Sequence, residues 1–130
     1  MTESSQRRWF NHYIDALNRD DLDGIAACYA PDLHITDGQT DHRSADAAMD
    51  FHRRSKGLVT RTLEVLAYVD RPGRIAAEIG SILQAHEDVP DHPAGPLTRG
   101  ERRTGVSFVI FDMADGRFTR IRSAPYKAAP

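Results

Sequence analysis

The chain has 130 residues, of which 40% are hydrophobic and 28% are charged, a balance that is ordinary for one globular domain. A net charge of −2 argues against nucleic acid or an anionic membrane as a partner, and the single Cys28 excludes an internal disulfide. No apolar run is long enough for a signal peptide or a membrane span. We therefore expect one domain over residues 1–130, located in the cytoplasm.

The sequence begins with two predicted helices. Apolar residues recur at helical spacing between Trp9 and Leu17, and Ser4 or Ser5 can act as the N-cap. An aspartate pair then starts a second, short helix over residues 20–29, which Pro31 ends.

A short strand and a third helix follow. Residues 33–37 alternate as a strand with one buried face, and a polar turn over 38–42 comes after it. Ser44 caps a helix that runs to about Lys56. The inward stripe of this helix consists of Ala45, Ala48, Met49 and His52.

In the second half of the chain, apolar and polar residues alternate as they do in strands. Four strands are predicted, over residues 61–70, 74–86, 101–112 and 117–126. A Pro- and Asp-rich loop over 87–98 and a turn at Asp115-Gly116 separate the later ones. Helices followed by hairpin-linked strands predict an α+β fold, in which helices pack on one face of a curved antiparallel sheet.

Asp37 is the unusual residue of the first strand. It falls on the same face as Leu33 and Ile35, where an unpaired carboxylate is costly. One interpretation is that Asp37 faces a pocket, where loss of solvent raises its pKa and makes it a better base near neutral pH. The other is that Asp37 simply caps the turn at Gly38.

The stretch HYIDALNRDDLDGIAACYAPDLHITDG, residues 12–38, resembles the NTF2-like superfamily of cone-shaped α+β domains. Within it, the chain is most similar to ketosteroid isomerase and the SnoaL-like polyketide cyclases. The element order extends this resemblance from Trp9 to about Tyr126. It implies a curved sheet wrapped around the N-terminal helices, an internal pocket, and chemistry without a cofactor.

The resemblance also implies roles for particular residues. Asp37 takes the place of the general base that moves a proton next to a carbonyl, and Tyr13 that of the oxyanion donor. Ser107 stands where the family has a second donor, a protonated Asp. Tyr29 matches a further pocket tyrosine, and His52 occupies a position that is often Tyr. Three alternatives remain open: Tyr13 as a core tyrosine, His52 as a satisfied half-buried histidine, and Ser107 as a small strand residue without a catalytic role.

We expect the pocket to bind a small hydrophobic molecule. The substrate-binding residues predicted for it are Ile14, Leu17, Tyr29, Leu33, Ile35, Met49, His52 and Arg122. No metal site is expected, because the histidines and acids around the 87–98 loop lack a regular ligand spacing; they are His86, Asp88, Asp91 and His92.

The leading hypothesis is a cofactor-independent proton-transfer enzyme, an isomerase, cyclase or dehydratase, that acts on a small hydrophobic carbonyl compound. The first alternative is a non-catalytic domain for ligand binding or assembly. A further alternative is epoxide hydrolysis, which Arg122 together with Asp37 suggests. Fold alone does not decide among them.

The outer face of the predicted sheet suggests self-association. Val106, Phe108 and Ile110 point away from the pocket side and would be exposed together. A homodimer through this face is therefore expected.

Overall fold

The computed structural model of the chain describes residues 4–93 and 95–128. Its elements in chain order are α1 (Ser5–Asn18), α2 (Leu22–Ala26), β1 (Tyr29–Thr36), β2 (Asp41–His42), α3 (Ala45–Ser55), β3 (Val59–Arg71), β4 (Arg74–Ala85), β5 (Arg102–Ala114) and β6 (Arg117–Ala128). N-terminal helices followed by a sheet give the α+β class that the sequence predicts.

Each helix begins at a side chain that satisfies one of its free N–H groups. The Ser4 and Ser44 hydroxyls and the Asp21 carboxylate each accept a hydrogen bond from the main-chain N–H three residues later, at 3.0 to 3.1 Å. These three caps fix where the chain turns from loop into helix.

β1 starts earlier than predicted, and α2 is correspondingly shorter. The short helix ends at Ala26, and Tyr29 pairs with Phe118 of β6 instead of continuing the helix. Pro31 lies inside β1, where the register shifts between Tyr29 and His34 and no ladder hydrogen bond from its nitrogen is needed. The tertiary pairing therefore overrides the local helical pattern.

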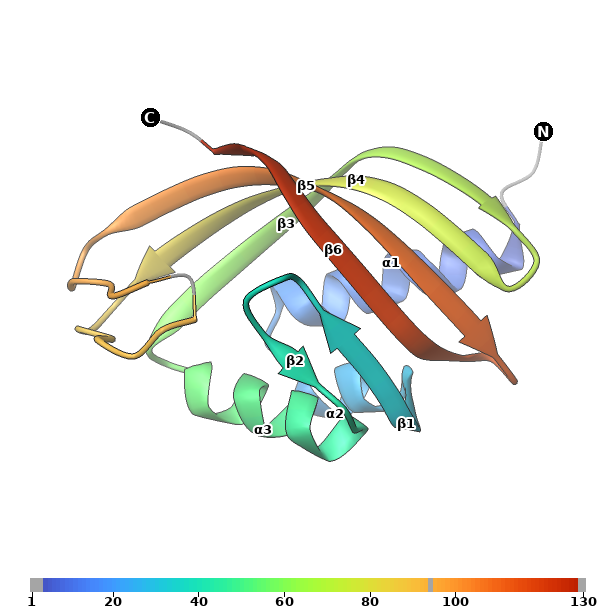
Figure 1. The fold of residues 1–130 in the computed structure, drawn as a ribbon, viewed down its shortest axis with the longest axis horizontal. Coiled ribbons are helices and arrows are strands. Elements are labelled where there is room, and N and C mark those ends of the chain that lie inside the picture. Colours follow the sequence, from blue (N-terminus) through green and yellow to red (C-terminus); the bar gives the residue numbers. More distant parts are fainter. Residues whose placement is uncertain (1–3, 94, 129–130) are drawn as a thin grey trace.

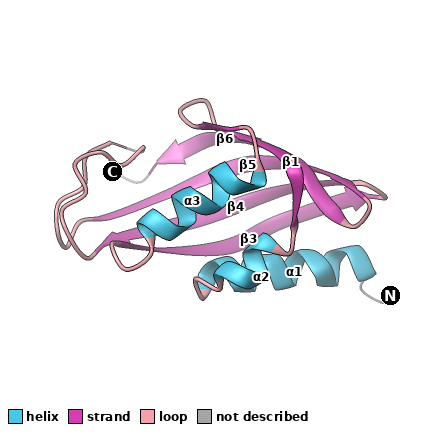
Figure 2. Ribbon diagram, turned by 90° about the horizontal axis from the view of Figure 1, so that it is seen from below, coloured by secondary structure: helices cyan, strands magenta, loops and turns pink. Residues whose placement is uncertain are grey.

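The strands form a six-stranded sheet in the order β2-β1-β6-β5-β4-β3. Neighbouring strands are antiparallel except β1 and β6, which run parallel. The sheet curls without closing and arches over the helices (Figure 1). Seen from below, α3 lies across the concave face, while α1 and α2 lie beside β3 (Figure 2). The concave face and the helices enclose the core.

A bulge in β3 changes which of its side chains face inward. The register shifts between Val65 and Ala67, which leaves one extra residue in β3. Simple alternation from Leu63 and Val65 would place Ala67 and Val69 inward as well, and the bulge ends that alternation. Beyond the bulge Tyr68 packs against the core, and Val69 is 68% exposed.

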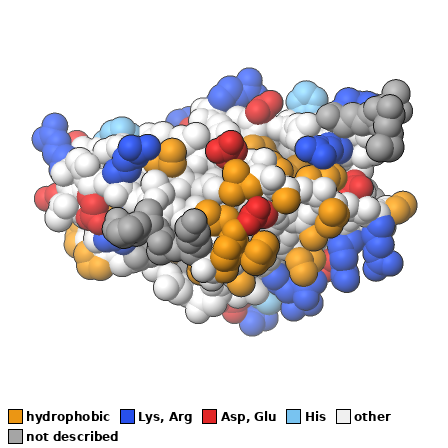
Figure 3. All heavy atoms as spheres, turned by 90° about the horizontal axis from the view of Figure 1, so that it is seen from above, with side chains coloured by type: hydrophobic (Ala, Val, Ile, Leu, Met, Phe, Trp, Pro, Cys, Tyr) orange, Lys and Arg blue, Asp and Glu red, His pale blue; other side chains and the backbone are white. Residues whose placement is uncertain are grey.

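The convex face of the sheet carries several exposed apolar side chains, and Figure 3 shows hydrophobic side chains gathered there. Phe108 is 52% exposed and Ile110 is 38% exposed, as predicted, whereas Val106 is half-buried. The ring of Phe108 stacks on that of Tyr126 at a centroid distance of 4.2 Å. The Tyr126 hydroxyl in turn donates to the carboxylate of Glu78.

In the part of the chain that the structure describes, no helix has the length and apolar character needed to span a bilayer. The cytoplasmic location expected from the sequence stays a prediction.

Candidate functional site

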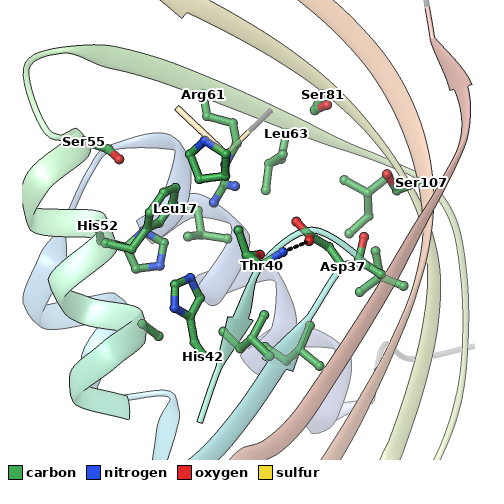
Figure 4. Close-up of a pocket in the computed structure, with 18 of the residues that line it drawn as sticks. Leu17, Asp37, Thr40, His42, His52, Ser55, Arg61, Leu63, Ser81 and Ser107 are labelled. Atoms are coloured by element: carbon green, nitrogen blue, oxygen red, sulfur yellow. Dashed lines mark hydrogen bonds between the residues drawn. The ribbon is translucent and has the colours of Figure 1, made fainter. Parts of the chain in front are cut away.

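A cavity of about 440 Å³ lies between the concave face of the sheet and the helices (Figure 4). The residues predicted for the site that line it are Tyr13, Ile14, Leu17, Tyr29, Ile35, Asp37, His52 and Ser107. They come from α1, β1, α3 and β5, together with the turn after β1, so the fold brings distant segments to one space.

Three predicted binding residues lie elsewhere. Leu33 is fully buried and Met49 is 7% exposed, and both belong to the hydrophobic core instead of the cavity wall. Arg122 neighbours Ile121 on β6, and because Ile121 lines the cavity, Arg122 is on the other face of the sheet. There its guanidinium lies 3.4 Å from the carboxylate of Asp112. Arg122 and Asp37 therefore do not share the pocket, which removes the residue pair that suggested epoxide hydrolysis.

Asp37 is held by the tight turn that follows β1. Its Oδ1 accepts hydrogen bonds from the main-chain N–H of Gln39 at 2.8 Å and of Thr40 at 2.7 Å. The residue is half-buried and lines the cavity, and the bond to Thr40 is drawn in Figure 4. The turn-cap and pocket interpretations of the sequence are thus both realised by one side chain.

The charge state of Asp37 is decided by these donors. Burial by itself acts to raise the pKa of the carboxyl group, but hydrogen bonds from the Thr40 and Gln39 main chain and from the Thr40 hydroxyl outweigh it. The pKa of Asp37 is therefore lowered, and the raised value expected from the sequence is wrong. Asp37 is an ionised carboxylate throughout the physiological range.

A chain of three side chains from three elements forms another polar part of the cavity lining. The hydroxyl oxygens of Tyr13, on α1, and Tyr29, on β1, lie 2.9 Å apart. The Tyr29 hydroxyl lies 3.3 Å from Nε2 of His52, on α3, and the two rings stack. In the described residues no hydrogen bond joins this chain to Asp37, although both line the same cavity.

Burial keeps all three members of this chain neutral. It raises the pKa of Tyr13 well above its ordinary range and that of Tyr29 to about 12. It also lowers the pKa of His52 to about 4, with further lowering by the nearby positive charge of Arg61 and by His42. A neutral His52 therefore faces Tyr29 at physiological pH.

The structure adds polar residues that the sequence interpretation did not assign to the pocket. Arg61, His42 and His92 line it, as do Gln39 and Thr40. Arg61 could have been assigned to the pocket from the sequence. It lies two residues from both Val59 and Leu63, so it shares the inner face of β3 with them. The histidines gave no such signal, since turn and loop geometry brings them to the cavity.

Ser107 lies on the inner face of β5, opposite Ile79 of β4, and Figure 4 shows it on the same side of the cavity as Asp37. Within the described residues, no group of three or more His, Cys, Asp or Glu side chains is arranged to hold a metal ion.

A curled, unclosed sheet over N-terminal helices is the architecture of the NTF2-like class of cone-shaped domains. The sequence profile of the SnoaL-like domain matches residues 10–121. The chain belongs to this SnoaL-like family.

Solved structures share the fold at low sequence identity. A SnoaL-like polyketide cyclase from Agrobacterium tumefaciens is 16% identical with a TM-score of 0.74, over 96% of this chain and 94% of the other. An LEH-like epoxide hydrolase from M. tuberculosis is 19% identical with a TM-score of 0.77, over 93% and 82%. An NTF2-like protein of unknown function from Burkholderia pseudomallei is 18% identical with a TM-score of 0.74, over 93% and 90%. In sequence, no curated protein matches the chain.

Proposed function

We propose that this protein is a cofactor-independent proton-transfer enzyme that acts on a small hydrophobic carbonyl compound, with Asp37 as the general base. The observation that carries the proposal is the pairing of an ionised carboxylate with a neutral donor chain across one cavity. A carboxylate has about four lone-pair sites, so the donors of the turn leave Asp37 able to accept a substrate proton. Membership in a family that processes small molecules supports it further.

The Tyr13–Tyr29–His52 chain supplies the matching hydrogen-bond donor. If the Nε2 of neutral His52 carries the proton, it donates to Tyr29, and the Tyr29 hydroxyl then donates to Tyr13. The Tyr13 hydroxyl is left to donate to an oxygen in the cavity. When Asp37 removes a proton from carbon, the electron pair of the broken C–H bond forms an enolate, whose oxygen this hydroxyl stabilises.

The lowered pKa of Asp37 narrows the reaction type. A weak base transfers a proton efficiently only from a relatively acidic carbon, such as one that lies between two carbonyl groups. Carbons of this kind occur in polyketide-like chains, and the enolate formed from one can attack a second carbonyl to close a ring. Among isomerase, cyclase and dehydratase chemistry, we therefore favour a cyclase, in line with the SnoaL-like polyketide cyclase of similar fold.

Proton exchange tests this function without knowledge of the natural substrate. We expect the enzyme to catalyse exchange of deuterium from solvent into an aryl 1,3-diketone, at the carbon between its two carbonyl groups. NMR would monitor the exchange. Asp37→Asn should remove the catalysis, whereas Asp32→Asn, an exposed carboxylate on the same strand, should leave it intact. Equal rates for wild type and Asp37→Asn would replace this proposal with the ligand-binding alternative.

We further propose that two copies associate through the convex face of the sheet. The exposed Phe108 and Ile110 support this, because a second copy would remove both from water. Phe108→Asp should shift sedimentation at micromolar concentration from dimer to monomer. A wild-type protein that sediments as a monomer under the same conditions would contradict the dimer.

A further inference from the structure

Arg61 occupies a position where an apolar side chain is expected. The inner face of β3 runs through Val59, Arg61 and Leu63, of which Val59 is 7% exposed and Leu63 packs against the core. The residue paired with Arg61 on β4 is Leu83, which also lines the cavity. Figure 4 shows the Arg61 side chain reaching from β3 into this space. Arg61 is itself exposed, so its guanidinium lines the cavity and is also accessible from solvent to a charged ligand.

Within the described part of the chain, no carboxylate pairs with Arg61. The structure gives the Arg61 guanidinium neither a hydrogen bond nor an ion pair at 4.0 Å or less. The neighbouring Arg103, in contrast, forms an ion pair with Glu101, whose carboxylate lies 2.6 Å from the Arg103 Nε. The two acids that line the cavity, Asp20 and Asp37, form no ion pair with Arg61.

The groups around Arg61 leave its charge uncompensated. Its positive field contributes to the lowered pKa of His52, after burial, and to the lowered pKa of His92, after burial and Arg103, and neither histidine can supply a negative charge. The Asp37 carboxylate, which lines the same cavity, is held by its own turn. The described residues that line the cavity therefore include one arginine and two acids, Asp20 and Asp37, and neither acid pairs with the arginine.

We propose that Arg61 binds a carboxylate group of the substrate, so that the natural ligand is a carbonyl compound that also carries a carboxylic acid. This rests on the proposed function for the reacting carbonyl and adds the substrate class. The planar guanidinium presents two parallel N–H donors that match both oxygens of a carboxylate. A single unpaired cation matches the single charge of a carboxylate better than the double charge of a phosphate ester. Arg61 would fix the acid end while Asp37 and Tyr13 face the carbonyl end.

A matched pair of probes tests this proposal by calorimetry at neutral pH. Benzoylpropionate has an aryl ketone and a carboxylate, and benzoylpropionamide has the same shape without the charge. The wild type should bind the acid about tenfold to hundredfold more tightly than the amide, as for a hydrogen bond to a charged group. Arg61→Gln should lose this preference. Arg71→Gln, the same charge change at the far end of β3, should keep it.

Two further measurements keep the result decisive. The Asp37→Asn variant should retain the preference for the acid, so a failure of proton transfer does not affect this test. In the wild type, the side-chain NMR signal of Arg61 should move on addition of the acid and not of the amide, which needs no substitution. Equal affinity for the two probes, binding of neither, or a preserved preference in Arg61→Gln would overturn the proposal.

Discussion

Asp37 and His52 lie in one pocket, yet their environments set their charges in opposite ways. Both are partly withdrawn from water, and burial alone would make each of them neutral. His52 follows this rule, because its polar contact is the hydroxyl of Tyr29. Asp37 does not, because three hydrogen-bond donors of its own turn hold it ionised. The comparison shows that local donors, more than depth in the pocket, decide which group can act as a base.

Removal of the carboxylate is the change with the largest expected effect. Asp37→Asn keeps the shape of the side chain but cannot accept a proton, so turnover should disappear while ligand affinity is preserved or tightened. Steady-state kinetics and calorimetry on the same preparation would check this. Full activity in Asp37→Asn would show that the ionised end of the pocket is not the catalytic one.

The neutral end is tested by Tyr13→Phe. This substitution removes the last donor of the chain and should reduce kcat by about 100- to 1,000-fold, as expected for one lost oxyanion donor. KM should change much less, because the hydroxyl acts mainly on charge that develops in the transition state. A loss confined to KM would mean that Tyr13 only positions the ligand.

His52→Gln should change how stability depends on pH. The pKa of His52 is about 4 in the folded protein and about 6.5 when unfolded, so between these values the unfolded state binds the proton and the fold loses stability as pH falls. The loss of melting temperature between pH 6.5 and pH 4 should be smaller in His52→Gln than in wild type. Identical slopes would contradict a neutral, buried His52.

The smallest expected effect comes from the turn that holds Asp37. Thr40→Val removes the hydroxyl donor and keeps the main-chain N–H, so the pKa of Asp37 should rise slightly toward its ordinary value. Carbon NMR of the carboxyl group would record the titration. Thr36→Val, on the opposite face of β1, is the control and should leave the pKa of Asp37 unchanged.

Local features of the molecule could be predicted from the sequence. The caps at Ser4, Asp21 and Ser44 and the turn at Asp115-Gly116 depend on neighbouring residues alone, and the structure has them all. The placement of Asp37 on the cavity side of its strand also follows from simple alternation.

Features that depend on distant pairing could not be predicted. Tyr29 belongs to a strand because β6 is available to pair with it. The bulge of β3 depends on its register with β4, and it turned Val69 outward. The pKa of Asp37 was predicted in the wrong direction because the donors of Gln39 and Thr40 appear only once the turn has closed.

The pH dependence of kcat/KM for proton exchange tests the central claim most directly, since it reports the ionisation of the free enzyme's base. If Asp37 is that base, its lowered pKa predicts a rate that is flat between about pH 5 and pH 8 and falls only below the ordinary carboxyl value of about 3.9. A rate that instead rises through about pH 6.5 would show that a group other than Asp37 is the base and would contradict the account.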